Sequence, residues 1–446
     1  MSMGQPTVTG TSLRRTLRLR DLIFYGLIVI QPTAPMPMYG VVSQEARGHV
    51  VTTILIAMLA MSLTAVSYGR MARVYPSAGS AYAYMAGEFG SAAGTLVGWA
   101  ILLDYLLNPL ICVIWCSAAA ANFLPMIPLW LWKLFFALLF TGLNLRAIQA
   151  SARLNRWLTI GLCTVVGVLL VEFCAYIFLH GSLSPAGLLK PFYDSSTFSL
   201  KAVSTGTSIA ALTYIGFDSI STLSEEAINP YRDVMRATVL TCLLTGVLAA
   251  IEVYTAQLVW PEFWHYPNVD TAYVFVAGKA GGTAMFNLIN AALLVATIGS
   301  GTASMLGAAR LLYGMGRHGA LPRFFAFVSS STNIPSRNVL ICGALALVGA
   351  WAMSYQLGAE LLNFGAFLAF AGVNASSFRH YWWKGRDRSW SQAVIPVCGF
   401  AVCLYIWLSL RPQAKIAGLV WTTIGCVYFG VRLAARRRSQ PPALPT

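Results

Sequence analysis

The chain has 446 residues, of which 57% are apolar and 10% are charged, and its formal net charge is +15. Soluble domains carry about a quarter charged residues, so this composition excludes an ordinary soluble protein and predicts an integral membrane protein. In a soluble chain this positive charge would suggest a nucleic-acid partner. Here the basic residues follow the pattern of a membrane topology, so we expect a lipid bilayer and no nucleic acid as partner.

Apolar stretches long enough to cross a hydrocarbon core of ~30 Å recur along the whole chain. Most Lys and Arg residues fall in segments that share one side of the membrane if the N-terminus is cytoplasmic. This bias predicts a multi-pass protein of the plasma (inner) membrane with both termini in the cytoplasm. We predict an all-α fold with about twelve membrane-spanning helices, at 22–43, 50–69, 93–121, 128–146, 157–179, 204–226, 237–260, 284–312, 338–355, 358–379, 392–410 and 414–432.

The first predicted span contains three prolines within six residues, Pro32, Pro35 and Pro37. Proline lacks a backbone N–H and its ring clashes with the preceding helical turn, so a continuous helix is not expected there. Irregular backbone at membrane depth is tolerated only in a protein interior or beside a water-filled cavity. Gln31 and Thr33 lie at this interruption and are therefore candidate substrate-binding residues.

The third and fifth spans carry acidic residues, Asp104 and Glu172. Asp104 is followed directly by Tyr105, and a carboxylate beside an aromatic ring suits an organic ammonium ion, which gains both ion pairing and a cation–π contact. Glu172 has two interpretations. It is a candidate for proton coupling or gating, or an acid that burial and hydrogen bonding between helices keep neutral.

The sixth span is also interrupted in its middle, where Gly216 is followed by Phe217 and Asp218 and preceded by Tyr214. Two simple kinks would explain the backbone alone. However, both spans also change chemical character at the interruption. Corresponding interruptions in the two halves of a chain indicate a transporter built from inverted repeats, with its binding site at the interruptions.

The seventh span adds a fourth buried acid, Glu252, and no Lys or Arg lies at a matching depth to neutralise these acids. An ionised aspartate at a helix centre costs roughly 2.5–3.5 kcal/mol. We therefore expect some of the four to be protonated during part of a cycle, or to be neutralised by a cationic substrate. Glu225 and Glu226, at the inner end of the sixth span, are interpreted either as gating residues or as helix-ending residues paired with nearby arginines.

Several classes of function lack a signature in this sequence. All nine cysteines fall within predicted spans without a C-x-x-C pair, and the five histidines lie in loops or near span ends. These positions predict neither a metal site nor a disulfide. The sequence also contains no nucleotide-binding loop, so we expect neither an ATP-driven pump nor an enzyme, and no cofactor.

Three stretches, 75–84, 216–230 and 310–323, resemble the signatures of the amino acid–polyamine–organocation permeases, in the same order along the chain. Within that family, Leu103-Asp104-Tyr105, the stretch 40–43 and the stretch 363–366 are similar to bacterial putrescine importers. The resemblance covers nearly the whole chain. It implies secondary transport by alternating access around the two interruptions.

The resemblance implies a LeuT-like core, a five-plus-five inverted repeat, followed by two further helices. The corresponding regions are a cytoplasmic basic tail at 1–20, the core at 21–380, helices 11 and 12 at 381–433 and a cytoplasmic tail at 434–446. The candidate substrate-binding residues are then Gln31, Thr33, Asp104, Tyr105, Tyr214, Gly216, Phe217, Asp218 and Glu252, with Glu172, Glu225 and Glu226 as candidates for proton coupling or gating.

Two departures from the family pattern bear on the substrate. Members that carry α-amino acids have a glycine-rich break in helix 1 whose amides bind the substrate carboxylate, whereas the prolines here lack those donors. Putrescine importers carry an aspartate in the outer half of helix 1, where this chain reads Pro35-Met36-Pro37. Glu252 is a candidate for the missing anion. The leading hypothesis is import of an amine such as putrescine, and the alternative is an amino acid permease on the same fold.

The coupling ion has two candidates. Ser300, Thr302 and Ser304 in the eighth span resemble the remnant of a sodium site, but hydroxyls in membrane helices more often bond to the helix backbone or to a neighbouring helix. The fifth span lacks the lysine that replaces sodium in some relatives. We favour a proton carried by a buried carboxylate.

Overall fold

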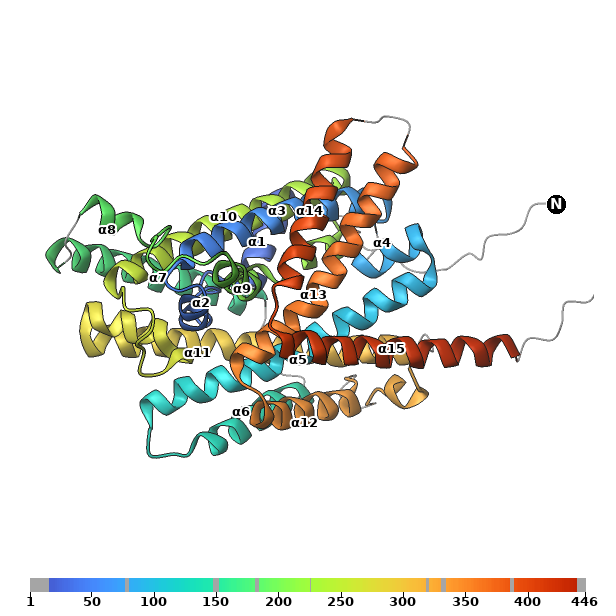
Figure 1. Ribbon diagram of the computed structural model, residues 1–446. Coiled ribbons are helices and arrows are strands. Elements are labelled where there is room, and N and C mark those ends of the chain that lie inside the picture. The colour runs from blue at the N-terminus through green and yellow to red at the C-terminus, as the bar shows by residue number, and fades with distance from the viewer. Residues whose placement is uncertain are drawn as a thin grey trace, which may run out of the picture.

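A computed structural model describes residues 16–76, 80–146, 152–180, 184–224, 226–317, 321–329, 334–385 and 389–438. The regular structure in these ranges is helical, with one isolated bridge between Leu17 and Ala227 (Figure 1). The α-helices are α1 (Leu19–Ile30), α2 (Tyr39–Glu45), α3 (Val50–Val74), α4 (Ser80–Phe89), α5 (Ser91–Phe123), α6 (Leu129–Leu145), α7 (Ala152–His180), α8 (Pro185–Leu189), α9 (Leu200–Ala210), α10 (Pro230–Val259), α11 (Ala272–Arg317), α12 (Ser336–Ala352), α13 (Tyr355–Phe378), α14 (Trp390–Leu408) and α15 (Pro412–Arg438). The shorter helical segments are η1 (Ala211–Tyr214), η2 (Phe217–Leu223), η3 (Val269–Thr271), η4 (Arg323–Ala326) and η5 (Arg379–Trp383).

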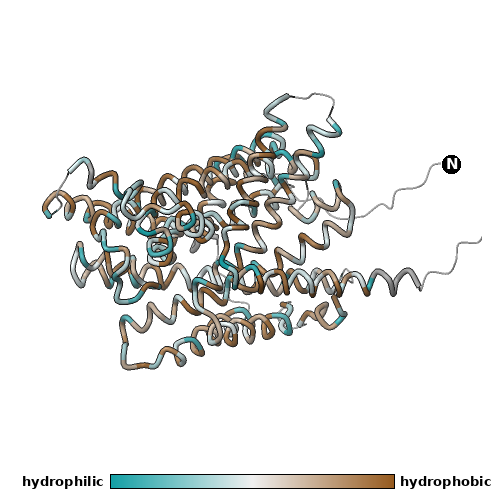
Figure 2. The backbone as a smooth tube through the Cα atoms, viewed as in Figure 1, coloured by the Kyte–Doolittle hydropathy of each residue, from teal (hydrophilic) through white to brown (hydrophobic). Residues whose placement is uncertain are grey.

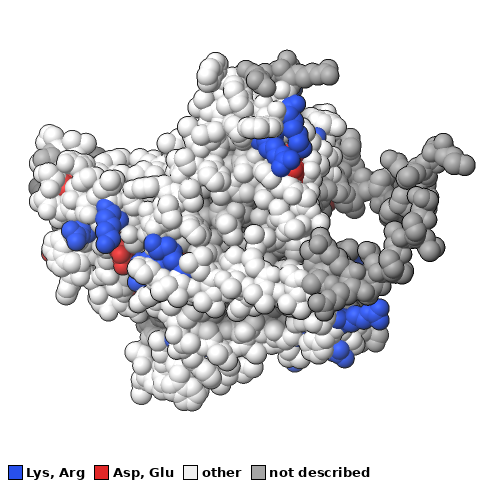
Figure 3. Space-filling view, turned by 45° about the vertical axis from the view of Figure 1, so that its right-hand side comes forward, with Lys and Arg blue, Asp and Glu red and all other residues white. Residues whose placement is uncertain are grey.

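Eight of the described helices, α3, α5, α7, α10, α11, α13, α14 and α15, are long and apolar enough to cross a membrane, and α6 and α12 are shorter apolar helices. Figure 2 shows apolar residues along most of the helical length and polar residues concentrated near helix ends and connections. In Figure 3 the Lys, Arg, Asp and Glu side chains on one face form a few separate groups on a largely uncharged surface. The chain is therefore a multi-pass membrane protein.

The predicted interruption of the first span is present. Helix α1 ends at Ile30, and the chain resumes helical structure at Tyr39 in α2. Gln31 has φ 70°, which is uncommon for a residue other than glycine, and the amides of Ala34 and Met36 close short turns on Gln31 and Thr33. Below, the end of the bundle where α1 begins is called the near end, and the end where α2 finishes is called the far end.

The predicted interruption of the sixth span is also present, and it is more irregular than a kink. Helix α9 tightens into η1, the chain turns at Gly216, and η2 continues as a 3₁₀-helix. Gly216 has φ 114°, and a Cβ there would lie 2.8 Å from Cγ1 of Val29. Both the backbone conformation and the close approach to α1 therefore favour glycine.

The near ends of the two interrupted segments are joined through the backbone. The amides of Thr16 and Leu17 donate hydrogen bonds to the carbonyl of Glu226 at 2.9 and 3.0 Å, and the amide of Ile228 donates to the carbonyl of Leu17 at 2.9 Å. These bonds attach the start of α1 to the chain that follows η2. The near-end halves of both interrupted segments are thus held together.

Helix α4 is fixed at the near end by one buried carboxylate. Glu88 accepts hydrogen bonds from the Tyr75 hydroxyl at 3.0 Å and from Lys384 Nζ at 2.9 Å, and its Oε1 lies 2.7 Å from His380 Nδ1. We call these four residues the near-end clasp. On the other side of α4, the Ser80 hydroxyl lies 2.9 Å from that of Ser221 in η2. Helix α4 therefore connects the sixth-span interruption to the end of α13.

Helix α11 begins earlier than the span predicted at 284–312. The backbone leaves helical geometry at Gly281 and Gly282, and Gly282 has φ 69°. The portion before these glycines is a distinct segment at the far end, which follows η3. This segment and η3 pack against α2, where a Cβ on Gly40 would overlap the carbonyl oxygen of Val269 in η3 and Cβ of Ala272 in α11. A glycine is therefore needed for this close approach.

Candidate functional site

Asp218 occupies the second position of η2, directly after the turn at Gly216. Backbone N–H groups of Gly216, Asp218 and Ser219 lie close enough to interact with its carboxylate. The side chain is half-buried. Burial disfavours the charged form of this side chain, and contacts with backbone N–H groups offset part of that cost.

Two other elements bring side chains within electrostatic range of Asp218. Helix α5 supplies Asp104 and Tyr105, and α1 supplies Tyr25. We call Tyr25, Asp104, Tyr105 and Asp218 the aspartate cluster. Tyr105 is 36% exposed and its ring borders Gly307 of α11, so the cluster remains partly open.

The aspartate cluster has a distinctive electrostatic character. Among the residues that the structure describes, no Lys, Arg or His forms an ion pair with Asp104 or Asp218. Two carboxylates in mutual range disfavour each other's ionisation unless a cation or a proton intervenes. With Tyr25 and Tyr105 adjacent, the arrangement suits an organic cation.

Aromatic side chains that were not predicted as site residues pack around the predicted Phe217 and border this cluster. The ring centroid of Phe217 lies 5.5 Å from that of Tyr68 and 5.2 Å from that of Phe370. Tyr68 and Tyr84 lie within electrostatic range of Asp218. Tyr84 was visible only as part of the 75–84 signature, and neither Tyr68 nor Tyr25 stood out in the sequence because tyrosine is common in apolar helices.

Other predicted site residues make mainly structural contacts. The Tyr214 hydroxyl donates to the carbonyl of Ile54 at 2.9 Å and is fully buried, which anchors η1 to α3. The side-chain amide of Gln31 donates a hydrogen bond to the backbone carbonyl of Ala296 in α11 at 3.3 Å. Thr33 is buried within the break. These residues shape the interruptions.

Glu252 lies in a different environment from the aspartate cluster. It is fully buried in α10, where its interacting neighbours are Tyr273 of α11 and Cys163 of α7. The Tyr273 hydroxyl donates to the backbone carbonyl of Glu252 at 3.3 Å. The structure therefore groups Glu252 with the far-end segments.

Of the remaining acidic candidates, Glu172 lies apart from both groups and Glu226 borders the aspartate cluster. Glu172 is half-buried on α7, and its Cγ borders Gly281 at the bend of α11. The carbonyl of Glu226 accepts the bonds that join the two near ends, and its side chain lies within electrostatic range of Tyr25. Glu225 lies outside the described residues.

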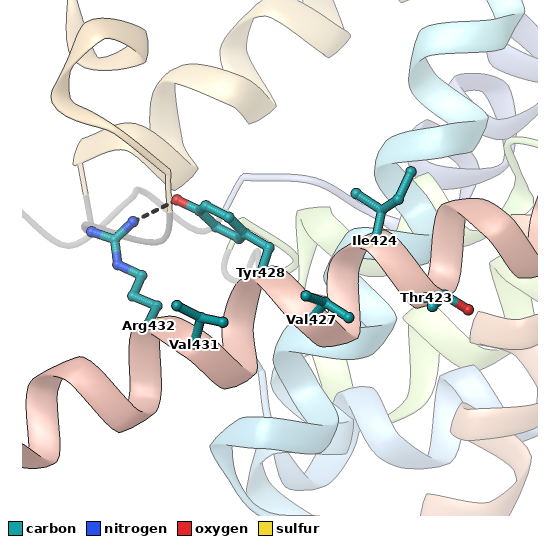
Figure 4. A pocket seen from close by; sticks show the side chains of 6 residues that line it. All are labelled: Thr423, Ile424, Val427, Tyr428, Val431 and Arg432. Carbon is teal, nitrogen blue, oxygen red and sulfur yellow. Dashed lines mark hydrogen bonds between the residues drawn. The ribbon is translucent and has the colours of Figure 1, made fainter.

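The surface also carries an apolar hollow along α15, away from the interruptions (Figure 4). Thr423, Ile424, Val427, Tyr428, Val431 and Arg432 line it. Arg432 donates a hydrogen bond to the Tyr428 hydroxyl at 2.7 Å. All six residues belong to one helix, so the hollow lacks the convergent groups from several elements that a substrate site requires.

Comparison with known proteins adds sequence relationships. The family model described as amino acid permease matches residues 35–430. The chain is 31% identical to the low-affinity putrescine importer PlaP of Escherichia coli (strain K12), over 98% of this chain and 97% of that protein. It is 25% identical to the methylthioribose transporter of Bacillus subtilis (strain 168), over 94% and 93% of the two chains. It is also 25% identical to the branched-chain amino acid permease BcaP of Lactococcus lactis subsp. cremoris (strain MG1363), over 93% and 94%.

Proposed function

Because this chain belongs to the amino acid permease family, whose members are transporters and not enzymes, we propose that it imports an organic amine such as putrescine. The observation that carries the proposal is the aspartate cluster. Two acidic side chains from α5 and η2 lie in mutual electrostatic range, and neither forms an ion pair with another described residue.

A diamine complements this pair because each of its ends carries one positive charge. One ammonium group binds Asp218, whose anion the backbone amides stabilise. The other approaches Asp104, and the faces of Tyr25 and Tyr105 contribute cation–π attraction, worth roughly 0.5–2 kcal/mol per contact. A monoamine neutralises only one of the two carboxylates, so we expect it to bind more weakly.

The break in the first span supports a substrate without a carboxylate. The three prolines of the break have no backbone N–H to donate. The N–H groups of Ala34 and Met36 already donate hydrogen bonds that close turns within the break. A substrate carboxylate therefore finds few free donors there. This supports an amine over an α-amino acid, although one relative is named as a branched-chain amino acid permease.

The proposed transport cycle alternates access between the near and far ends of the bundle. We propose twelve membrane crossings, a five-plus-five inverted repeat over 21–380 and two further helices over 381–433. With both termini cytoplasmic, the near end faces the cytoplasm and the far end faces outward, consistent with the basic residues of the near-end segments. A proton is the proposed coupling ion.

Uptake into proteoliposomes tests the substrate assignment. Purified protein should accumulate radiolabelled putrescine under an inward proton gradient, and a protonophore should abolish the accumulation. Unlabelled cadaverine should compete strongly, butylamine weakly and leucine not at all. If the protein takes up leucine but not putrescine, the proposal of an amine importer is wrong and the protein is an amino acid permease.

A further inference from the structure

Three tyrosines pack together around α2 at the far end of the bundle. Tyr39 contacts Tyr273 and Tyr266 edge to face, with ring centroids 5.3 and 6.2 Å apart. One turn later, the Ser43 hydroxyl donates to Gln257 Oε1 at 3.1 Å and lies 3.2 Å from the Tyr266 hydroxyl. We call these five residues the far-end tyrosine cluster. Because they come from α2, α10 and the segments before and within α11, opening of the far end would separate them.

Glu252 lies next to this cluster, and its backbone carbonyl accepts a hydrogen bond from the hydroxyl of Tyr273. Its side chain is fully buried, and neither carboxyl oxygen has a hydrogen-bond partner among the described residues. Gln257, five residues further along α10, belongs to the tyrosine cluster itself. One helix therefore carries both the closure contact and an unpartnered acid.

Among the described residues no Lys, Arg or His forms an ion pair with this acid. Lys279 of α11 lies over the ring of Trp260, beyond the end of α10, and His49, which precedes α3, accepts a hydrogen bond from the backbone amide of Asp194. Tyr273 of α11 and Cys163 of α7 lie within electrostatic range of Glu252. The Tyr214 hydroxyl from η1 lies beside Gly246, about 9 Å nearer the near end at 1.5 Å per residue. Helices α3 and α1 and segment η2 carry their titratable residues toward the near end: Tyr68, Arg70, Arg73, Arg20, Asp21, Tyr25 and Asp218.

An ionised carboxylate at this position would have neither a hydrogen bond nor a counter-ion, so its burial is far more costly than burial of the neutral acid. We propose that Glu252 is the proton-binding site that controls closure of the far end, and this inference rests on the alternating access proposed above. When the far end opens, water reaches the carboxylate, which ionises. A proton from the external solution then binds one carboxylate oxygen, and the neutral acid can be buried again as the tyrosine cluster re-forms.

This arrangement predicts a definite sign for the effect of external pH. Closure requires the protonated form, so acidic external solution favours the closed far end and alkaline solution opposes closure. Above the titration range, the closed population should fall up to about tenfold per pH unit, as expected for a single proton. Glu252→Gln carries a neutral side chain of similar shape, so its closure should no longer depend on pH.

Hydrogen–deuterium exchange without substrate tests this directly. Exchange of segments 39–45 and 262–276 is measured in proteoliposomes at pH 5.5 and 8, with correction for intrinsic exchange rates. Wild-type protein should protect both segments more strongly at pH 5.5, and Glu252→Asp should retain that difference. Glu252→Gln should protect them equally at both values. Glu262→Gln, a substitution at an exposed glutamate of the same outer segment, is the matched control and should behave as wild type.

Putrescine counterflow, which needs no proton gradient, supplies the second readout. Glu252→Gln should retain counterflow and lose its dependence on external pH, while gradient-driven accumulation falls at least tenfold. A wild-type pH profile in Glu252→Gln, for exchange or for counterflow, would overturn the inference. Loss of protection at both pH values would assign Glu252 a packing role and would also overturn it. If putrescine is not the substrate, counterflow fails in the wild type as well, whereas the exchange result still tests Glu252.

Discussion

The aspartate cluster and the site of Glu252, beside the far-end tyrosine cluster, place the same chemical group in opposite surroundings. Asp218 is half-buried, lies against backbone N–H groups and has a second acid, Asp104, within electrostatic range. Glu252 is fully buried and its carboxyl oxygens have no partner in the described part of the chain. In the sequence, Asp104, Asp218 and Glu252 look alike, because each is an acidic residue within an apolar stretch.

This contrast shows that the burial of a carboxylate does not by itself define the role of that carboxylate. Backbone N–H groups near Asp218 offset part of the cost of burying its charge, and a bound cation would supply the rest. The absence of both around Glu252 makes only the neutral acid compatible with the closed structure. The same helical protein can thus contain one acid that binds a cationic substrate and another that binds a proton, and substitutions should separate the two roles.

Asp218→Asn should have the largest effect. Removing one member of a buried charge pair costs about 2–5 kcal/mol, which corresponds to roughly 30-fold to several-thousand-fold weaker binding. The measurement is the putrescine-dependent thermal shift of purified protein together with uptake. Asp233→Asn, the same substitution in the first turn of α10, is the matched control. Normal uptake by Asp218→Asn would make this carboxylate structural and would remove the basis of the comparison.

Asp104→Asn should have a smaller and more selective effect. It removes the charge that we assign to the second ammonium group, so putrescine should bind about 10- to 100-fold more weakly. Butylamine, with a single ammonium group, should lose much less. The ratio of putrescine to butylamine inhibition constants measures this selectivity. An equal loss for both amines would show that Asp104 does not discriminate between diamines and monoamines.

Glu88 of the near-end clasp extends the comparison to an acid that already has its cation. Burial raises the pKa of Glu88, but hydrogen bonds from Lys384, His380 and Tyr75 more than offset this and hold the pKa below its ordinary value of 4.5. Ionised Glu88 therefore contributes its full stabilisation of the folded protein above pH 4.5. This contribution is lost as the pH falls through the lowered pKa of Glu88.

Glu88→Gln should destabilise the protein by roughly 1–2 kcal/mol, because Lys384 is half-exposed and water compensates part of the loss. Putrescine affinity should not change. Thermal unfolding at pH 7 and pH 4 measures the effect, and the gap between mutant and wild type should narrow at the lower pH. A gap that is equal at both values would show that the charge of Glu88 does not contribute.

The sequence was informative where covalent chemistry restricts the backbone. Pro32, Pro35 and Pro37 leave few alternatives to an interrupted first span, and Gly216 marked the second interruption. The all-helical fold followed from apolar stretches of membrane-crossing length, and family membership followed from ordered motifs. These features are local, so they can be recognised without knowledge of the packing.

Sequence reasoning could not separate features that depend on contacts between distant segments. It grouped Glu252 with Asp218 because both are acids in apolar helices, and it gave no role to Tyr25, which α1 brings within range of Asp218. The helical start of α11 before Gly281 was likewise missed, because a short apolar segment becomes a helix at the far end only where α2 offers a surface for packing. The arrangement of α1, α5 and η2 around one point is a property of the tertiary structure.

Tyr273→Phe should have the smallest effect and should act only at the far end. The substitution keeps the ring contact with Tyr39 but removes the hydroxyl that donates to the carbonyl of Glu252. One hydrogen bond contributes about 0.5–1.5 kcal/mol, so far-end protection in hydrogen exchange should decrease by roughly 2- to 13-fold at acidic pH. Putrescine affinity should stay at the wild-type value because the aspartate cluster is untouched. Tyr193→Phe, at an exposed tyrosine, controls for the loss of a hydroxyl. If Tyr273→Phe weakens putrescine binding as strongly as Asp104→Asn does, the two regions act as one site and the division between cation binding and proton binding fails.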